Sequence, residues 1–69
     1  MARRVTFASR LRELRDHRGW TQEKLAKLTG VSGEYVSLLE SGIRNPSYAT
    51  QEALAKAFGM KISKLMEGV

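Results

Sequence analysis

The sequence predicts an all-α fold built from five short helices, and three observations support this prediction. Glycines at positions 19, 30, 42 and 59 separate segments of about ten residues, a length typical of helices rather than strands. Apolar residues within these segments recur at spacings of three and four. A Thr or Ser precedes several of the segments, where it can serve as a helix N-cap. With 69 residues and no cysteine, we expect one small domain over residues 1–69, stabilised by helix packing rather than by disulfide bonds.

The first helix is expected over residues 7–18, with Thr6 as its N-cap. One apolar stripe, at positions i, i+4 and i+7, is formed by Phe7, Leu11 and Leu14. Trp20 follows the end of this helix, and we expect it to pack into the core beside the next turn.

The second and third helices are expected over residues 22–28 and 33–40, with Thr21 and Ser32 as N-caps. Between them, Gly30 can adopt the left-handed conformation that ends one helix and turns the chain. The buried contacts are expected from Leu25, Ala26, Leu28, Val31, Val36 and Leu39. Two helices joined by such a turn, over about residues 21–41, form a helix-turn-helix arrangement whose second helix is free to enter a major groove.

The fourth helix is expected over residues 48–58, after a short loop at 43–46, with Ser47 as its N-cap. Its apolar side comprises Ala53, Leu54, Ala57 and Phe58. A short fifth helix over residues 62–67 carries Ile62, Leu65 and Met66.

The charge balance favours a polyanionic partner. Twelve Lys and Arg against seven Asp and Glu give a formal net charge of +5, for which nucleic acid is the commonest explanation, although many small proteins are basic without binding it. No apolar run approaches the ~18 residues of a membrane span. No apolar segment follows the basic N-terminus as in a signal peptide. We therefore expect no membrane partner and a cytoplasmic, nucleoid-associated location.

Catalytic and metal chemistry find little support in the sequence. His17 is the single histidine and there is no cysteine, so a metal site is not expected. No nucleophile motif is present, and a small helical domain offers little room for a substrate pocket. We expect no enzyme activity, no cofactor and no small-molecule ligand.

Six short motifs occur in a fixed order: LRELR at 11–15, TQEKLA at 21–26, GVS at 30–32, YVSLLESG at 35–42, RNPS at 44–47 and LAKAFGM at 54–60. Together they resemble the Cro/phage-repressor type of helix-turn-helix domain, the XRE-like family. Within that family the chain looks most like the controller proteins of restriction–modification systems. The resemblance implies a compact five-helix domain and a sequence-specific transcription regulator. It also places a recognition helix, at about 32–40, in the major groove of double-stranded DNA.

The resemblance also implies which residues meet base edges, namely Ser32, Gly33, Glu34, Ser37 and Leu38. Glu34 can accept a hydrogen bond from cytosine N4. Leu38 either contacts a thymine methyl group or is a half-buried core residue. Gly33 allows close approach of the backbone to the groove, but it removes a side chain that relatives often use for recognition.

By the same resemblance, the DNA backbone is contacted by Gln22, Tyr35, Arg44 and Asn45. Gln22 begins the second helix, where backbone N–H groups favour a phosphate, and the alternative is an ordinary exposed glutamine. Tyr35 either donates its hydroxyl to a phosphate or serves only in packing. Arg44 either follows the DNA backbone, enters a narrow minor groove or is simply solvated.

Two further pairs of charged residues have different expected roles. The resemblance implies that Arg15 and Glu40 form a partly buried ion pair that fixes the angle of the recognition helix. Arg3 and Arg4 either lie along the phosphates or form a disordered tail, and we favour the tail.

A homodimer is expected because one such module buries little DNA surface, whereas two copies about 34 Å apart read a pseudo-palindromic operator. The candidate interface consists of Met60, Ile62, Leu65 and Met66, with Val69 as a further candidate. The alternative is that these residues only cover the core. A second reading of the whole scaffold is a protein-interaction module, such as an antitoxin or anti-regulator.

Overall fold

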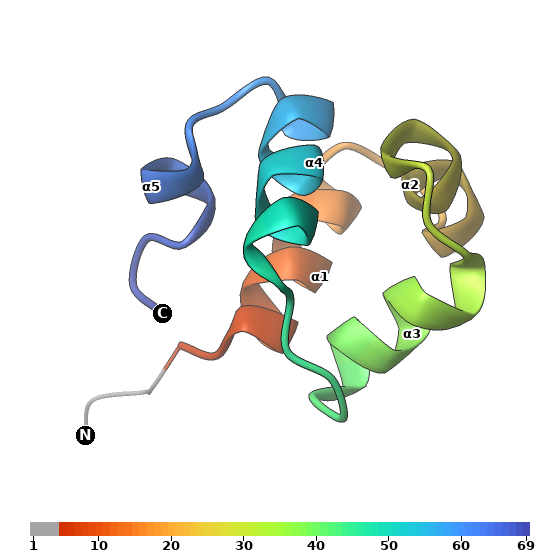
Figure 1. Cartoon of the computed structure of the whole chain (residues 1–69), viewed down its shortest axis with the longest axis horizontal. Coiled ribbons are helices and arrows are strands. Elements are labelled where there is room, and N and C mark those ends of the chain that lie inside the picture. Colours follow the sequence, from red (N-terminus) through yellow and green to blue (C-terminus); the bar gives the residue numbers. More distant parts are fainter. Residues whose placement is uncertain (1–4) are drawn as a thin grey trace.

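The computed structural model describes residues 5–69, which form five helices and no strands within that range. These are α1 (Phe7–His17), α2 (Gln22–Thr29), α3 (Gly33–Ser41), α4 (Tyr48–Phe58) and α5 (Ile62–Leu65). Figure 1 shows α2 and α3 on one side of α1 and α4, and α5 on the other. The all-α prediction is confirmed, although α5 ends earlier than expected. Arg3 and Arg4 lie outside the described residues, and no helix within 5–69 is long and apolar enough to cross a membrane.

The four longer helices begin at the N-caps that the sequence predicts. The side chains of Thr6, Thr21, Ser32 and Ser47 each accept a hydrogen bond from the backbone N–H three residues later. Each such bond satisfies a donor that the first helical turn leaves unpaired, and its loss typically costs about 1 kcal/mol. The helix starts are therefore encoded locally.

Each of the five helices contributes buried side chains to one hydrophobic core. Its buried apolar side chains are Phe7, Leu11, Leu25, Ala26, Val36, Leu39, Leu54, Ala55, Phe58 and Leu65. Val36 and Leu39 place the inner side of α3 against α1 and α2, as expected. Trp20 packs against this core with its ring stacked on Phe58 at 5.2 Å between centroids.

Two apolar residues lie elsewhere than the sequence suggests. Leu65 is 0% exposed, so the prediction that it belongs to a dimer interface is wrong. The α4–α5 packing instead buries its side chain within the chain's own core. Leu28 was expected in the core but is 45% exposed, because Leu25 and Ala26 already supply the buried side of α2.

Gly30 sets the angle between α2 and α3. Its φ of +78° lies in the left-handed region, which glycine adopts without the strain that a Cβ atom introduces. Its N–H and that of Val31 both donate to the carbonyl oxygen of Ala26, at 2.8 and 3.2 Å. The chain therefore leaves α2 at once and starts α3 after Ser32.

Two arginines hold the carboxyl ends of neighbouring helices. Arg10 donates to the carbonyl oxygens of Lys64 and Leu65 at 2.9 and 3.2 Å. Arg18 donates to the carbonyl oxygen of Phe58 at 2.6 Å, and its guanidinium lies over the Trp20 and Phe58 rings. Cations are favourable at helix C-termini, where carbonyl groups lack intrahelical partners. Part of the positive charge of the sequence therefore serves the fold.

Candidate nucleic-acid interface

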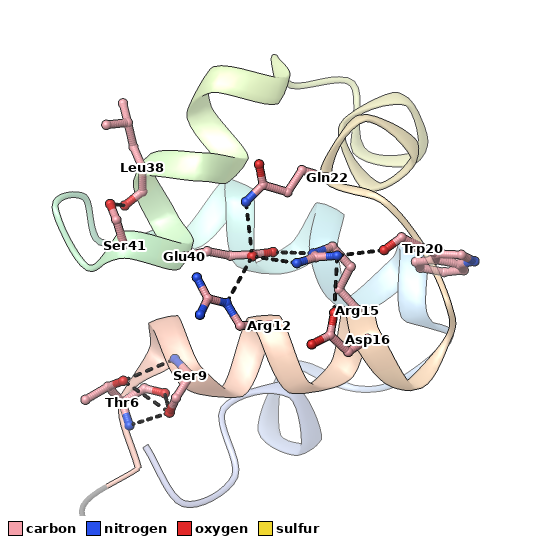
Figure 2. Close-up of polar contacts among 10 residues, drawn as sticks. All are labelled: Thr6, Ser9, Arg12, Arg15, Asp16, Trp20, Gln22, Leu38, Glu40 and Ser41. Atoms are coloured by element: carbon pink, nitrogen blue, oxygen red, sulfur yellow. Dashed lines mark hydrogen bonds and ion pairs between the residues drawn. The ribbon is translucent and has the colours of Figure 1, made fainter.

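The side of α3 that faces away from the core carries the predicted base-reading residues. Ser32, Glu34 and Ser37 are exposed, and Gly33 and Leu38 are half-buried. Figure 2 shows the Leu38 side chain directed away from α1 and from the Glu40 contacts. Within residues 5–69, the side chains of Glu34 and Ser37 make no hydrogen bond or ion pair, so both remain available to an external partner.

The first turn of α3 has two features that matter for close approach. The Ser32 hydroxyl oxygen accepts from the N–H of Tyr35 at 3.0 Å, which leaves its hydroxyl proton free to donate elsewhere. Gly33 has an ordinary helical conformation. A Cβ atom added there meets only Glu23 Cγ, at 3.9 Å. The packing of the chain itself therefore gives no reason for glycine at this position.

The residues predicted to contact the DNA backbone around α3 differ in burial. Tyr35 is half-buried, with its hydroxyl 3.5 Å from Thr50 Oγ1 on α4, so it packs between helices and keeps its polar end at the start of α4. Arg44 and Asn45 are exposed in the loop after α3. Their side chains form no hydrogen bond or ion pair with the part of the chain that the structure describes.

Glu40 is the centre of a network that joins three helices. Arg15 donates to both of its carboxylate oxygens, through Nε to Oε2 at 2.6 Å and through Nη2 to Oε1 at 3.0 Å. Gln22 Nε2 donates to Oε1 at 3.2 Å, and Arg12 Nε lies 3.7 Å from the same oxygen (Figure 2). Arg15 also donates to the carbonyl oxygen of Trp20 at 2.7 Å. The network therefore ties the end of α3 to α1 and to the start of α2.

The charge of Glu40 is stabilised despite its burial. Burial alone raises the pKa of this carboxyl group, but the hydrogen bonds from Arg15 and Gln22, with the charges of Arg15 and Arg12, outweigh it. The pKa of Glu40 is therefore below its usual value. The hydrogen bond to Glu40 correspondingly raises the pKa of Arg15. Glu40 thus stays ionised at neutral pH and holds its donors in place.

Sequence reasoning identified Arg15 and Glu40 but missed two partners of this carboxylate. For Gln22 the sequence predicts a phosphate contact or an ordinary exposed side chain, whereas its side-chain amide binds Glu40. Arg12 was given no role. A signal was present: Glu40 follows Val36 by four residues, on the buried side of α3, and a buried carboxylate needs several donors.

Beside this network, an open cleft of about 680 Å³ runs along α1. Its lining residues are Thr6, Ala8, Ser9, Arg12, Glu13, Asp16, His17 and Glu40. Within residues 5–69, His17 belongs to no group of three or more side chains that could hold a metal ion.

In this all-helical domain, α3 follows α2 across a left-handed glycine turn, and the outer side of α3 is exposed. This is the arrangement of a helix-turn-helix domain of the Cro/repressor type. The family model described as "Helix-turn-helix domain" matches residues 6–66. The chain belongs to this family of DNA-binding transcriptional regulators and repressors, as its motifs predicted.

Relatives and solved structures agree with this assignment. The chain is 43% identical over 65 residues to the HTH-type transcriptional regulator DdrOP3 of Deinococcus deserti, covering 94% of this chain and 50% of the relative. The chain thus spans half the length of that relative. Its fold is similar to the restriction-modification controller protein C.AhdI of Aeromonas hydrophila, with 42% identity, a TM-score of 0.83 and coverage of 87% and 91%. The P22 c2 repressor in complex with a synthetic operator has 28% identity, a TM-score of 0.84 and coverage of 94% and 98%.

Proposed function

We propose that this chain is a single DNA-binding domain over residues 1–69 that regulates transcription by reading a specific double-stranded sequence. The observation that carries this proposal is the two-sided character of α3. Val36, Leu39 and Glu40 are buried, whereas Glu34 and Ser37 are exposed and unpaired within residues 5–69. A helix held firmly on one side and bare on the other fits the major groove. The similarity to a repressor solved with its operator supports the same geometry.

Base recognition is assigned to Ser32, Gly33, Glu34, Ser37 and Leu38. Glu34 is acceptor-only when ionised, which suits the N4 amino group of cytosine. Leu38, on the same side of α3, offers an apolar contact for a thymine methyl group. Gly33 lets the backbone at the start of α3 lie close to the bases.

Phosphate contacts are assigned to Gln22, Tyr35, Arg44 and Asn45. Gln22 begins α2, whose N-terminal N–H groups and dipole favour an anion. Its amide binds Glu40 through Nε2, which leaves a second N–H and the backbone N–H for a phosphate. Arg44 and Asn45 are exposed beside the end of α3 and suit the flanking DNA backbone.

A homodimer is assigned to the half-buried apolar surface of Met60, Ile62 and Met66, with exposed Val69 beside it. Two copies whose recognition helices lie about 34 Å apart match one turn of DNA and a pseudo-palindromic operator. Sedimentation of the protein with DNA carrying two half-sites should give two chains per duplex. One chain per duplex at saturation contradicts this assignment.

The experiment that tests the function is selection of bound DNA from random sequence, followed by gel-shift titration. Glu34→Ala should relax preference at one base position by about 1–3 kcal/mol. Gln22→Ala should instead weaken binding to all sequences similarly, because it removes a phosphate contact. If no sequence competes better than bulk DNA, the proposal fails. If the chain instead recovers a protein ligand, it is a protein-interaction module.

A further inference from the structure

Arg12 differs from Arg15 and Gln22, the two residues that donate hydrogen bonds to Glu40. Glu40 has a fully buried carboxylate, and Arg15 is 14% exposed, whereas the Arg12 side chain is 60% exposed. Arg12 Nε lies 3.7 Å from Glu40 Oε1, which is longer than a hydrogen bond. Arg12 is therefore the loosely held member of the network.

Releasing Arg12 leaves no buried charge without a partner. Both oxygens of Glu40 keep their hydrogen bonds to Arg15, and Oε1 also keeps the bond from Gln22. The other nitrogens of the Arg12 guanidinium make no hydrogen bond with the described residues 5–69. Arg12 is also one of the residues that line the open cleft along α1. The Arg12 guanidinium is exposed and makes no hydrogen bond to Glu40, so moving it breaks only a charge contact at 3.7 Å.

The position of Arg12 points to the start of α2. Gln22 Nε2 and Arg12 Nε contact the same oxygen at 3.2 and 3.7 Å, so the two nitrogens are at most about 7 Å apart. A single phosphate group accepts hydrogen bonds on several sides and can bridge donors at this spacing. Figure 2 shows the Arg12 and Gln22 side chains approaching Glu40 from opposite sides.

The acidic residues nearest to Arg12 on α1 do not oppose an anion strongly. Glu13 lies 3.4 Å from Arg10 Nη1, and Asp16 lies 3.3 Å from Arg15 Nη1. Each carboxylate is thus already paired with another arginine. Arg12 is thus an exposed and weakly paired cation on α1.

We propose that Arg12 binds the same backbone phosphate as Gln22, by turning from Glu40 to the DNA. This inference rests on the proposed DNA-binding function and adds a contact to it. In the free protein, the charge contact with Glu40 keeps the Arg12 guanidinium near the start of α2.

The test is the salt dependence of DNA binding by the full chain. A lost phosphate contact lowers the slope of log K against log salt by about one. We expect this change for Arg12→Ala, with unchanged base preference and a nearly unchanged thermal midpoint. Arg12→Lys should restore most of the slope. The matched control is Lys64→Ala on α5, which removes a cation that is 59% exposed and should leave the slope unchanged.

A second measurement locates the phosphate. Neutral methylphosphonates are placed one at a time in the selected DNA. We expect one position at which neutralisation weakens the wild type but has little further effect on either Arg12→Ala or Gln22→Ala. If Arg12→Ala and Gln22→Ala lose their sensitivity to neutralisation at two different phosphate positions, the two residues do not share a phosphate. If the slope of log K against log salt is unchanged in Arg12→Ala, the inference is overturned. If the thermal midpoint also falls, the role of Arg12 is to stabilise the fold. If the wild type binds no DNA selectively, the proposed function fails instead.

Discussion

Arg15 meets Glu40 edge to edge, so that two nitrogens of one guanidinium bond to the two oxygens of one carboxylate. Such bidentate pairs are among the stronger hydrogen-bonded contacts in proteins. Because Glu40 is buried, removal of its main partner leaves a desolvated charge. Arg15→Ala should therefore lower the free energy of unfolding by about 3 kcal/mol, more than the pair itself contributes. Urea unfolding followed by circular dichroism measures this loss.

The control for that prediction is the double variant Arg15→Met with Glu40→Leu, which removes both charges while keeping apolar volume. It should recover much of the stability that Arg15→Ala loses, because no unpaired charge remains. If Arg15→Ala alone is neutral, Glu40 does not depend on this partner.

The stability of the domain should depend on pH through Glu40. Its folded-state pKa is below the ordinary value, since the hydrogen bonds from Arg15 and Gln22 and the charges of Arg15 and Arg12 outweigh burial. The contribution is therefore fully present above the ordinary Glu pKa of about 4.3 and is lost as the pH falls through the lower folded-state value. Urea midpoints measured from pH 7 to pH 2 should fall in that acid range. In Glu40→Gln the part of the decline due to this group should be absent, and an identical decline contradicts the assignment.

Gly33→Ala should separate stability from binding. Alanine is favoured over glycine in a helix by up to about 1 kcal/mol, and the added Cβ meets only Glu23 Cγ at 3.9 Å. The variant should melt at a higher temperature. If the start of α3 lies close to the bases, it should also bind the selected DNA less tightly. Equal or tighter binding argues against close approach at this residue.

Gly30→Ala should have the opposite effect on stability. The φ of Gly30 is +78°, which costs an L-residue about 1 kcal/mol or more, even though a Cβ there finds open space. Thermal unfolding should show a lower midpoint than the wild type, with Gly33→Ala as the matched substitution at an ordinary helical φ. A midpoint equal to the wild type shows that the turn tolerates a side chain.

Features encoded by near neighbours were predictable from the sequence. The N-caps at Thr21 and Ser32 and the turn at Gly30 depend on residues within one helical turn, and they form as expected. The buried positions of Val36 and Leu39 follow from helical periodicity in the same way.

Features that depend on distant parts of the chain were not predictable. Leu65 is buried because α5 packs on α4, which periodicity in a four-residue helix does not indicate. The bonds from Arg10 and Arg18 to carbonyl oxygens span 40 residues or more of sequence. Likewise, Gln22 binds Glu40 only because the Gly30 turn brings α2 and α3 together.

The bare side of α3 has a consequence for how this domain changes over time. Glu34 and Ser37 contribute neither core packing nor hydrogen bonds within residues 5–69, while Val36, Leu39 and Glu40 maintain the scaffold from the opposite side. Substitutions at the outward positions are therefore nearly free of folding cost. Under the proposed function, changing a few residues on this side of α3 would change the DNA sequence that is bound, which makes the domain a practical starting point for engineered regulators.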